Sequence, residues 1–172
     1  MIRRLSDRSG FTLVELLIVV IILGVLAAIA IPQFGSNTED AKVASLDTSL
    51  TELRNAIELY YHQHGGVYPG AVKETDGTAV ATAGEAQAAF VKQLMLYSSS
   101  AGVTNGSKDA TYKYGPYVKK GIPTNPFNNL STVVCDIATT DISTVASGGT
   151  AGWKFYVKTG RLIADDGAHD SH

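Results

Sequence analysis

The first third of the chain is dominated by one long apolar stretch. Residues 11–31 read FTLVELLIVVIILGVLAAIAI, and Glu15 is the one charged residue among them. As an α-helix these residues would extend about 32 Å, which matches the hydrocarbon core of a bilayer. The pattern therefore predicts a transmembrane helix over residues 11–32, with Pro32 at its far end.

A second apolar pattern, with a different period, follows Pro32. Residues 33–62 place apolar side chains three and four positions apart, which predicts an amphipathic helix with one buried stripe. This helix either continues from the transmembrane helix with a bend or starts anew near Thr38. The stripe consists of Val43, Leu46, Leu50, Leu53, Ile57 and Tyr60.

Residues 63–172 mix loops, a short helix and strands, which predicts a globular α+β head. Near its end, Trp153, Phe155 and Val157 alternate with more polar residues before the turn Thr159–Gly160, a pattern typical of a half-buried β-hairpin. The other predicted elements are a loop over 65–84, a helix over 85–97, a loop over 98–109, an extended segment over 115–127 and a strand over 132–138.

The charge and the cysteine content limit which functions and which covalent links the chain can have. The chain has a formal net charge of -2, and the first ten residues contribute three arginines and one aspartate, so the remainder carries about -4. This balance argues against nucleic acid as a partner. Cys135 is the one cysteine, so no intrachain disulfide can form, and its strand-like context favours a small packed residue.

Motifs for catalysis are absent from the sequence. The chain has no nucleotide-binding glycine motif, no zinc-ligand spacing and no nucleophile elbow. We therefore expect a protein that is not an enzyme.

The amino-terminal arginines and Glu15 carry the strongest functional signal. Arg3, Arg4 and Arg8 precede the apolar stretch, so the positive-inside rule places the amino terminus in the cytoplasm and residues 33–172 outside. An ionised carboxylate in hydrocarbon costs several kcal/mol unless it reaches the interface or a cationic partner. Glu15 either extends to the nearby interface or pairs with a positive group of another copy of the chain.

The segment RSGFTLVELLIVVIILGVLAAIAIP resembles the amino terminus of type IV prepilins and type II secretion pseudopilins. The resemblance implies that residues 1–10 are a basic leader, which prepilin peptidase removes after Gly10 before the new amine of Phe11 is methylated. It also implies that Glu15 neutralises the Phe11 amine of a neighbouring subunit.

The same resemblance implies a fold and an assembly. The protein would have a pilin-like fold, with a long spine helix packed on a small antiparallel β-sheet head. Gly24 and Pro32 would mark a segment of that helix that unwinds during assembly. The precursor would cross the inner membrane once. The mature protein would be a homo-oligomer, a periplasmic or cell-surface helical filament built by an inner-membrane platform protein and an assembly ATPase.

Two further questions stay open at the level of sequence. The resemblance does not separate a surface pilus from a secretion pseudopilus, although the lack of a disulfide favours the pseudopilin branch. Some pseudopilins bind calcium near the carboxyl terminus, and Asp165 and Asp166 are the candidate ligands here; the alternative is a solvated acidic tail. We expect no other cofactor.

A different class of protein would also explain the apolar segment. Residues 1–30 can be read as an export signal, with a small-residue cleavage site at Ala28-Ile29-Ala30. The remainder would then be a secreted or membrane-anchored binding domain. The mature amino terminus separates the two hypotheses, because the filament requires Phe11 as its first residue and the export signal leaves Ile31.

Overall fold

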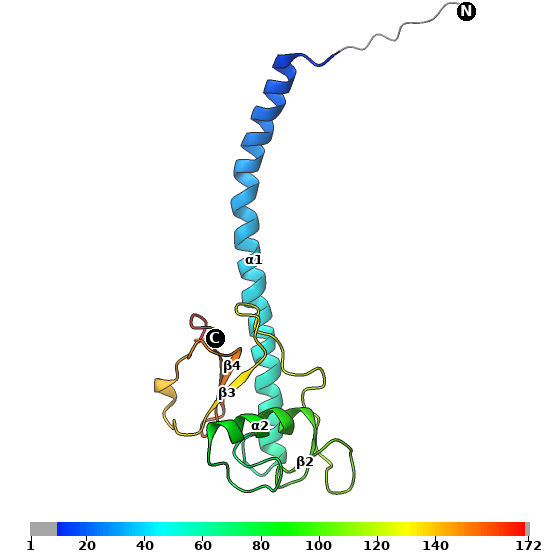
Figure 1. Ribbon diagram of the computed structural model, residues 1–172, viewed down its shortest axis with the longest axis vertical. Helices are drawn as coiled ribbons and strands as arrows, with labels where there is room; N and C mark the ends of the chain where they lie inside the picture. The colour runs from blue at the N-terminus through cyan, green and yellow to red at the C-terminus, as the bar shows by residue number, and fades with distance from the viewer. Residues whose placement is uncertain (1–9, 171–172) are drawn as a thin grey trace, which may run out of the picture. The chain divides into compact units, whose positions relative to one another are not determined.

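The structure is a computed structural model that describes residues 10–170, without the side chains of residues 28–37 and Thr144. Residues 1–9, which hold most of the predicted leader and its arginines, therefore lie outside the described residues. The chain divides into two compact units, one ending at Ala41 and one starting at Lys42. The elements in chain order (Figure 1) are α1 (Leu13–Gln63), α2 (Ala83–Met95), β1 (Tyr97–Ser98), β2 (Thr104–Asn105), β3 (Val133–Asp136), the 3₁₀-helix η1 (Ile142–Thr144), β4 (Trp153–Tyr156) and β5 (Arg161–Ala164).

Helix α1 is continuous over 51 residues and contains both Gly24 and Pro32. The sequence left open whether the amphipathic part starts anew, and the structure shows one helix. Within the second unit, α1 buries most of the predicted stripe. Leu46, Leu50, Leu53, Ile57 and Tyr60 are each at most 1% exposed, and Val43 is half-buried. The 3.6-residue period thus identified the face of α1 that packs on the head.

Helix α2 confirms the predicted second helix and begins with a capping box. The Thr82 hydroxyl accepts the Glu85 N–H at 3.2 Å, and the Glu85 carboxylate accepts the Thr82 N–H at 3.3 Å. This reciprocal pair satisfies two backbone donors at the helix start. Phe90 of α2 then packs on Phe155 of β4 with ring centroids 4.7 Å apart.

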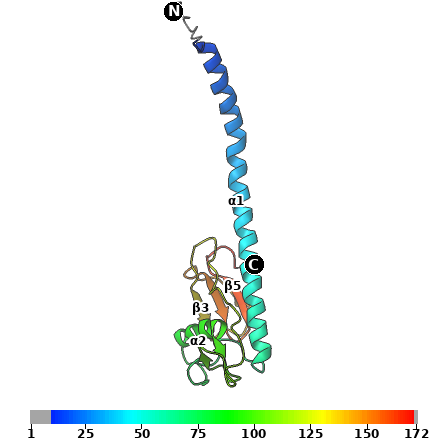
Figure 2. The ribbon, with the colours of Figure 1, turned by 90° about the vertical axis from the view of Figure 1, so that its right-hand side faces the viewer.

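The head is α+β, as predicted, but its three-stranded sheet is mixed rather than antiparallel. Strands β4 and β5 form the predicted antiparallel hairpin, with Phe155 opposite Leu162. The hairpin is not half-buried as predicted, because Tyr156 and Ile163, on the face opposite to Phe155, are also at most 1% exposed. Strand β3 instead pairs parallel to β4, with Cys135 opposite Phe155. The chain between β3 and β4 passes through η1 and returns to the starting end of β3, a crossover that only a parallel pair requires. In Figure 2, β5 lies beside the carboxyl-terminal part of α1.

Two local features were not predicted. Strands β1 and β2 pair over two residues each. The sequence assigns Tyr97 of β1 to the helix over 85–97 and the other three residues to the loop over 98–109, so neither strand was predicted. His64, at the end of α1, is only 5% exposed and stacks on Tyr60 at 3.7 Å. Its Nδ1 lies 2.9 Å from the Tyr60 carbonyl oxygen and its Nε2 lies 3.0 Å from the Ser98 hydroxyl, so His64 joins the helix end to β1.

Cys135 behaves as a packed residue. Its side chain is 2% exposed, and burial raises the pKa of the thiol to about 12. A thiol with so high a pKa is almost entirely protonated at neutral pH and therefore unreactive.

Candidate processing and assembly site

The predicted cleavage point lies in an exposed segment without regular secondary structure, directly before α1. Gly10 is exposed and Phe11 is 82% exposed. A Cβ atom added to Gly10 would meet no atom within 4 Å, and its φ lies outside the left-handed region. Among the described residues, neither packing nor backbone conformation requires a glycine at this position, and its role in cleavage stays a prediction.

Thr12 and Glu15 form a capping box at the start of α1. The Thr12 hydroxyl oxygen accepts the Glu15 N–H at 3.2 Å, and Glu15 Oε2 accepts the Thr12 N–H at 3.0 Å and the Thr12 hydroxyl at 2.9 Å. The capping box holds the Glu15 carboxylate at the first turn of α1, against the N–H of Thr12, which is the residue that follows Phe11. The spacing Thr-x-x-Glu before an apolar run is a known signature of a helix start, so this role of Thr12 was readable from the sequence.

The first part of α1 exposes nearly all of its apolar surface. Every large apolar side chain from Phe11 to Leu26 is between 49% and 85% exposed. A contiguous apolar surface of this size requires lipid or other protein chains to cover it. Gly24 lies within this stretch and Pro32 beyond it, and the unwinding of α1 around these residues stays a prediction.

The sequence predicted a membrane span over residues 11–32. Among the described residues, which do not include the side chains of residues 28–37, no helix is long and apolar enough to cross a bilayer.

Asp165, a candidate calcium ligand, is 1% exposed and lies at the centre of a hydrogen-bond network. Its carboxylate accepts the N–H groups of Gly149 at 3.1 Å and Ala151 at 2.9 Å. The further donors are the N–H groups of Gly148 and Thr150 and the hydroxyls of Ser147 and Thr150. The carboxylate therefore organises the loop over residues 147–151.

Asp166 is similarly occupied. Its carboxylate accepts the Asn125 side-chain amide at 3.1 Å and the His169 N–H at 2.9 Å. Burial alone would raise the pKa of Asp165 and Asp166, but the hydrogen bonds outweigh burial and hold each pKa below the ordinary aspartate value.

A cation at these two carboxylates would have to displace N–H donors. Across the described residues, no three His, Cys, Asp or Glu side chains are grouped so as to hold a metal ion. Calcium binding at Asp165 and Asp166 stays a prediction of the sequence.

Comparison with known proteins supports one family. The prokaryotic N-terminal methylation motif matches residues 5–31, which include Gly10, Phe11 and Glu15. The chain is 30% identical over 102 residues to the type IV major pilin protein PilE of Neisseria gonorrhoeae. It is also 25% identical over 152 residues to the type II secretion system core protein G of Vibrio cholerae. These likenesses support the type IV pilin and pseudopilin family for this chain.

The extent of the likeness differs between the two branches of the pilin and pseudopilin family. The chain spans 59% of the length of the N. gonorrhoeae pilin, and 49% of a Neisseria meningitidis fimbrial protein to which it is 36% identical. With the secretion core protein of V. cholerae, the match covers 87% of this chain and 88% of that protein. No solved structure matches the chain.

Proposed function

We propose that this member of the pilin and pseudopilin family is a structural subunit that repeats along an extracytoplasmic helical filament, either a type IV pilus or a type II secretion pseudopilus. One observation carries the proposal: the methylation motif coincides with an exposed Gly10–Phe11 bond directly before an uncovered apolar helix. In a filament, apolar helix faces of neighbouring subunits bury one another and replace lipid.

Processing would occur in two steps. Prepilin peptidase hydrolyses the Gly10–Phe11 peptide bond, and the free amine of Phe11 is then methylated. The precursor is anchored in the inner membrane with its leader in the cytoplasm. An inner-membrane platform protein and an assembly ATPase then drive subunits into a periplasmic or surface filament.

Glu15 would act at the moment of incorporation. Its carboxylate neutralises the Phe11 amine of a neighbouring subunit in an apolar surrounding, where an unpaired charge is costly. The capping box supports this role, because it fixes the carboxylate at the first turn rather than leaving it on a mobile side chain. Such a pair sets the stagger between subunits more than the strength of their contact.

Gly24 and Pro32 would permit local unwinding of α1 during packing. Glycine disfavours helix by about 1 kcal/mol, and proline removes a backbone donor and crowds the preceding turn. The helix between them is therefore the segment that costs least to extend.

The proposal is tested by expressing the chain in a bacterium with a pilus or pseudopilus assembly system, with and without its prepilin peptidase. We expect electron microscopy of the sheared fraction to show filaments of this protein only when the peptidase is present. Filaments in equal amount without the peptidase, or none in either strain, would contradict the proposal.

A further inference from the structure

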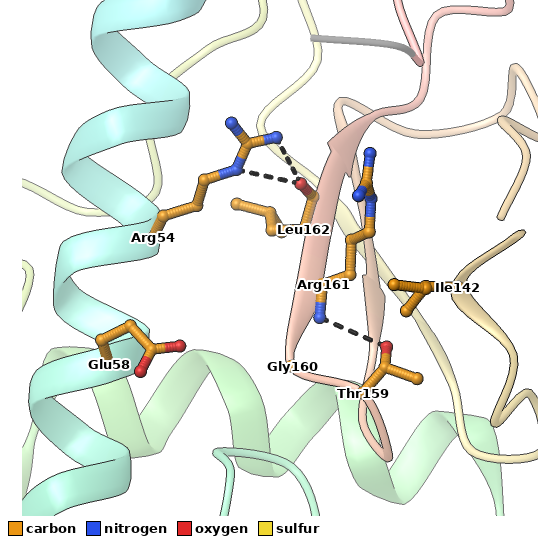
Figure 3. Close-up of a pocket in the computed structure, with 7 residues that line it drawn as sticks. All are labelled: Arg54, Glu58, Ile142, Thr159, Gly160, Arg161 and Leu162. Carbon is orange, nitrogen blue, oxygen red and sulfur yellow. Dashed lines mark hydrogen bonds between the residues drawn. The ribbon is translucent and has the colours of Figure 1, made fainter.

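A hollow of about 420 Å³ lies in the second unit, between α1 and the β4–β5 hairpin. Three separate elements line it: α1 contributes Arg54 and Glu58, the hairpin contributes residues 159–162, and η1 contributes Ile142. Figure 3 shows the guanidinium groups of Arg54 and Arg161 at the same end of the hollow, on either side of the backbone of Leu162.

Arg54 is held in place by the strand that it faces. Its Nε and Nη2 donate to the Leu162 carbonyl oxygen at 3.2 Å and 2.8 Å. Burial and the neighbouring positive charge of Arg161 lower the pKa of Arg54 and outweigh the negative charge of Asp47, which acts in the opposite direction. Two guanidinium groups that repel each other make this end of the hollow attractive for a carboxylate, which a guanidinium binds with paired N–H groups.

The hairpin turn at the other end of the hollow is closely packed. Gly160 adopts φ +72°, and a Cβ atom there would lie 2.2 Å from Cζ of Tyr68. The hairpin turn therefore packs directly on the Tyr68 ring, with no room for a side chain. Because this contact holds the turn in place, it also fixes the position of the backbone of the next residue, Arg161.

The rim of the hollow is apolar at one place. Ile142 is 59% exposed, a large uncovered surface for an isoleucine in the head. Arginine beside an exposed apolar side chain is the composition of a protein–protein interface rather than that of a small-ligand site. The partner should accordingly offer an acidic and an apolar side chain together.

Another face of α1 in the same chain carries both an acidic and an apolar side chain. A second hollow, of about 560 Å³, is lined by Asp47, Thr48, Thr51, Glu52 and Asn55. Glu52 is exposed and makes no side-chain hydrogen bond or ion pair with any described residue. Leu59 is 50% exposed and lies two turns further along the helix, about 10 Å away on the same side.

We propose that the Arg54–Arg161 hollow of one subunit receives the Glu52–Leu59 face of α1 from a second copy of this chain. Glu52 of the second copy pairs with the two arginines, and Leu59 packs on Ile142. The two surfaces differ, so the contact is heterologous and repeats from copy to copy, as a filament requires. This inference rests on the proposed filament function.

A charge swap tests the contact. We expect Arg161→Glu and Glu52→Arg each to lower the yield of sheared filaments about tenfold or more, because like charges then face each other across the interface. The double variant, with both changes, should recover most of the wild-type yield. Lys158→Glu, which makes the same change of charge on the same hairpin, should leave the yield unchanged.

Disulfide trapping provides a second readout that does not depend on yield. A chain with Glu52→Cys and Arg161→Cys should give a ladder of covalent dimers and higher oligomers in oxidised filaments. The buried thiol of Cys135 contributes no background. Each single cysteine variant should stay monomeric on the gel.

The outcomes separate the two proposals. Wild-type filaments with no ladder, or single charge variants that assemble normally, would overturn the contact and leave the filament function standing. A strain that makes no wild-type filament would overturn both.

Discussion

Replacing Glu15 with glutamine should abolish filament assembly while leaving the subunit folded and in the membrane. Glutamine keeps a side-chain oxygen that can accept the Thr12 N–H, so the start of α1 is preserved. It removes the negative charge, which leaves the Phe11 amine of the neighbour buried without a partner, at a cost of about 3–5 kcal/mol. We expect sheared filaments to fall about a hundredfold or more, measured by immunoblot against the membrane fraction.

The control for Glu15 separates its charge from its role in the helix cap. Thr12→Val removes the hydroxyl of the capping box and costs about 1 kcal/mol of helix stability, but it keeps the carboxylate. We expect this variant to assemble within about tenfold of wild type. Wild-type yield from Glu15→Gln, or a loss from Thr12→Val that equals it, would show that the charge is not what matters.

Asp165→Asn should be the most destabilising single change of a polar side chain in the head. The amide nitrogen would meet N–H groups that now donate to a buried carboxylate, including those of Gly149 and Ala151. Leaving such donors unsatisfied costs about 1–3 kcal/mol each, and a loss of about 3–5 kcal/mol is expected in total. Thermal unfolding of the full chain in detergent, followed by near-ultraviolet circular dichroism, measures it.

Asp109→Asn is the matched control for Asp165. The Asp109 carboxylate accepts the N–H groups of Thr111 at 2.7 Å and Tyr112 at 2.8 Å through one oxygen, in an exposed turn. Asparagine retains that oxygen, so the melting temperature should hardly change. Equal melting temperatures for Asp165→Asn and wild type would refute the role of Asp165 as the centre of the loop.

The pH dependence of unfolding should follow from the same carboxylate. The pKa of Asp165 is lower in the folded chain than in the unfolded chain, where an aspartate has a pKa of about 4. The stabilisation is therefore fully present above about pH 4 and is lost as the pH falls toward the folded value. We expect wild-type stability to drop over this acidic range and the drop to be smaller in Asp165→Asn.

The elements that the sequence predicted are those with a local periodic signal. The buried stripe of α1 and the alternation in β4 each repeat over several residues, so neighbours in the chain carry the information. The parallel pairing of β3 lacks such a signal, because it depends on where the chain returns after η1. The two-residue strands β1 and β2 are too short to show any period.

The candidate site residues were likewise predictable only where a local motif contains them. Gly10, Phe11 and Glu15 stand in a dense local motif, and Thr12 was available from the same spacing although it was missed. The role of Asp165 was not readable, because its donors at residues 147–151 are brought to it by tertiary folding. In a chain with a single cysteine, this network joins the end of β5 to the preceding loop without a disulfide.

The identity of the first residue of the mature protein is the most direct test of this account. Top-down mass spectrometry of the protein purified from its native membrane or filament measures it, and the methyl group shows as an added mass on the terminal amine. We predict a chain that starts at N-methylated Phe11. A chain that keeps Met1, or one that starts at Ile31 after loss of the apolar helix, would contradict the filament function.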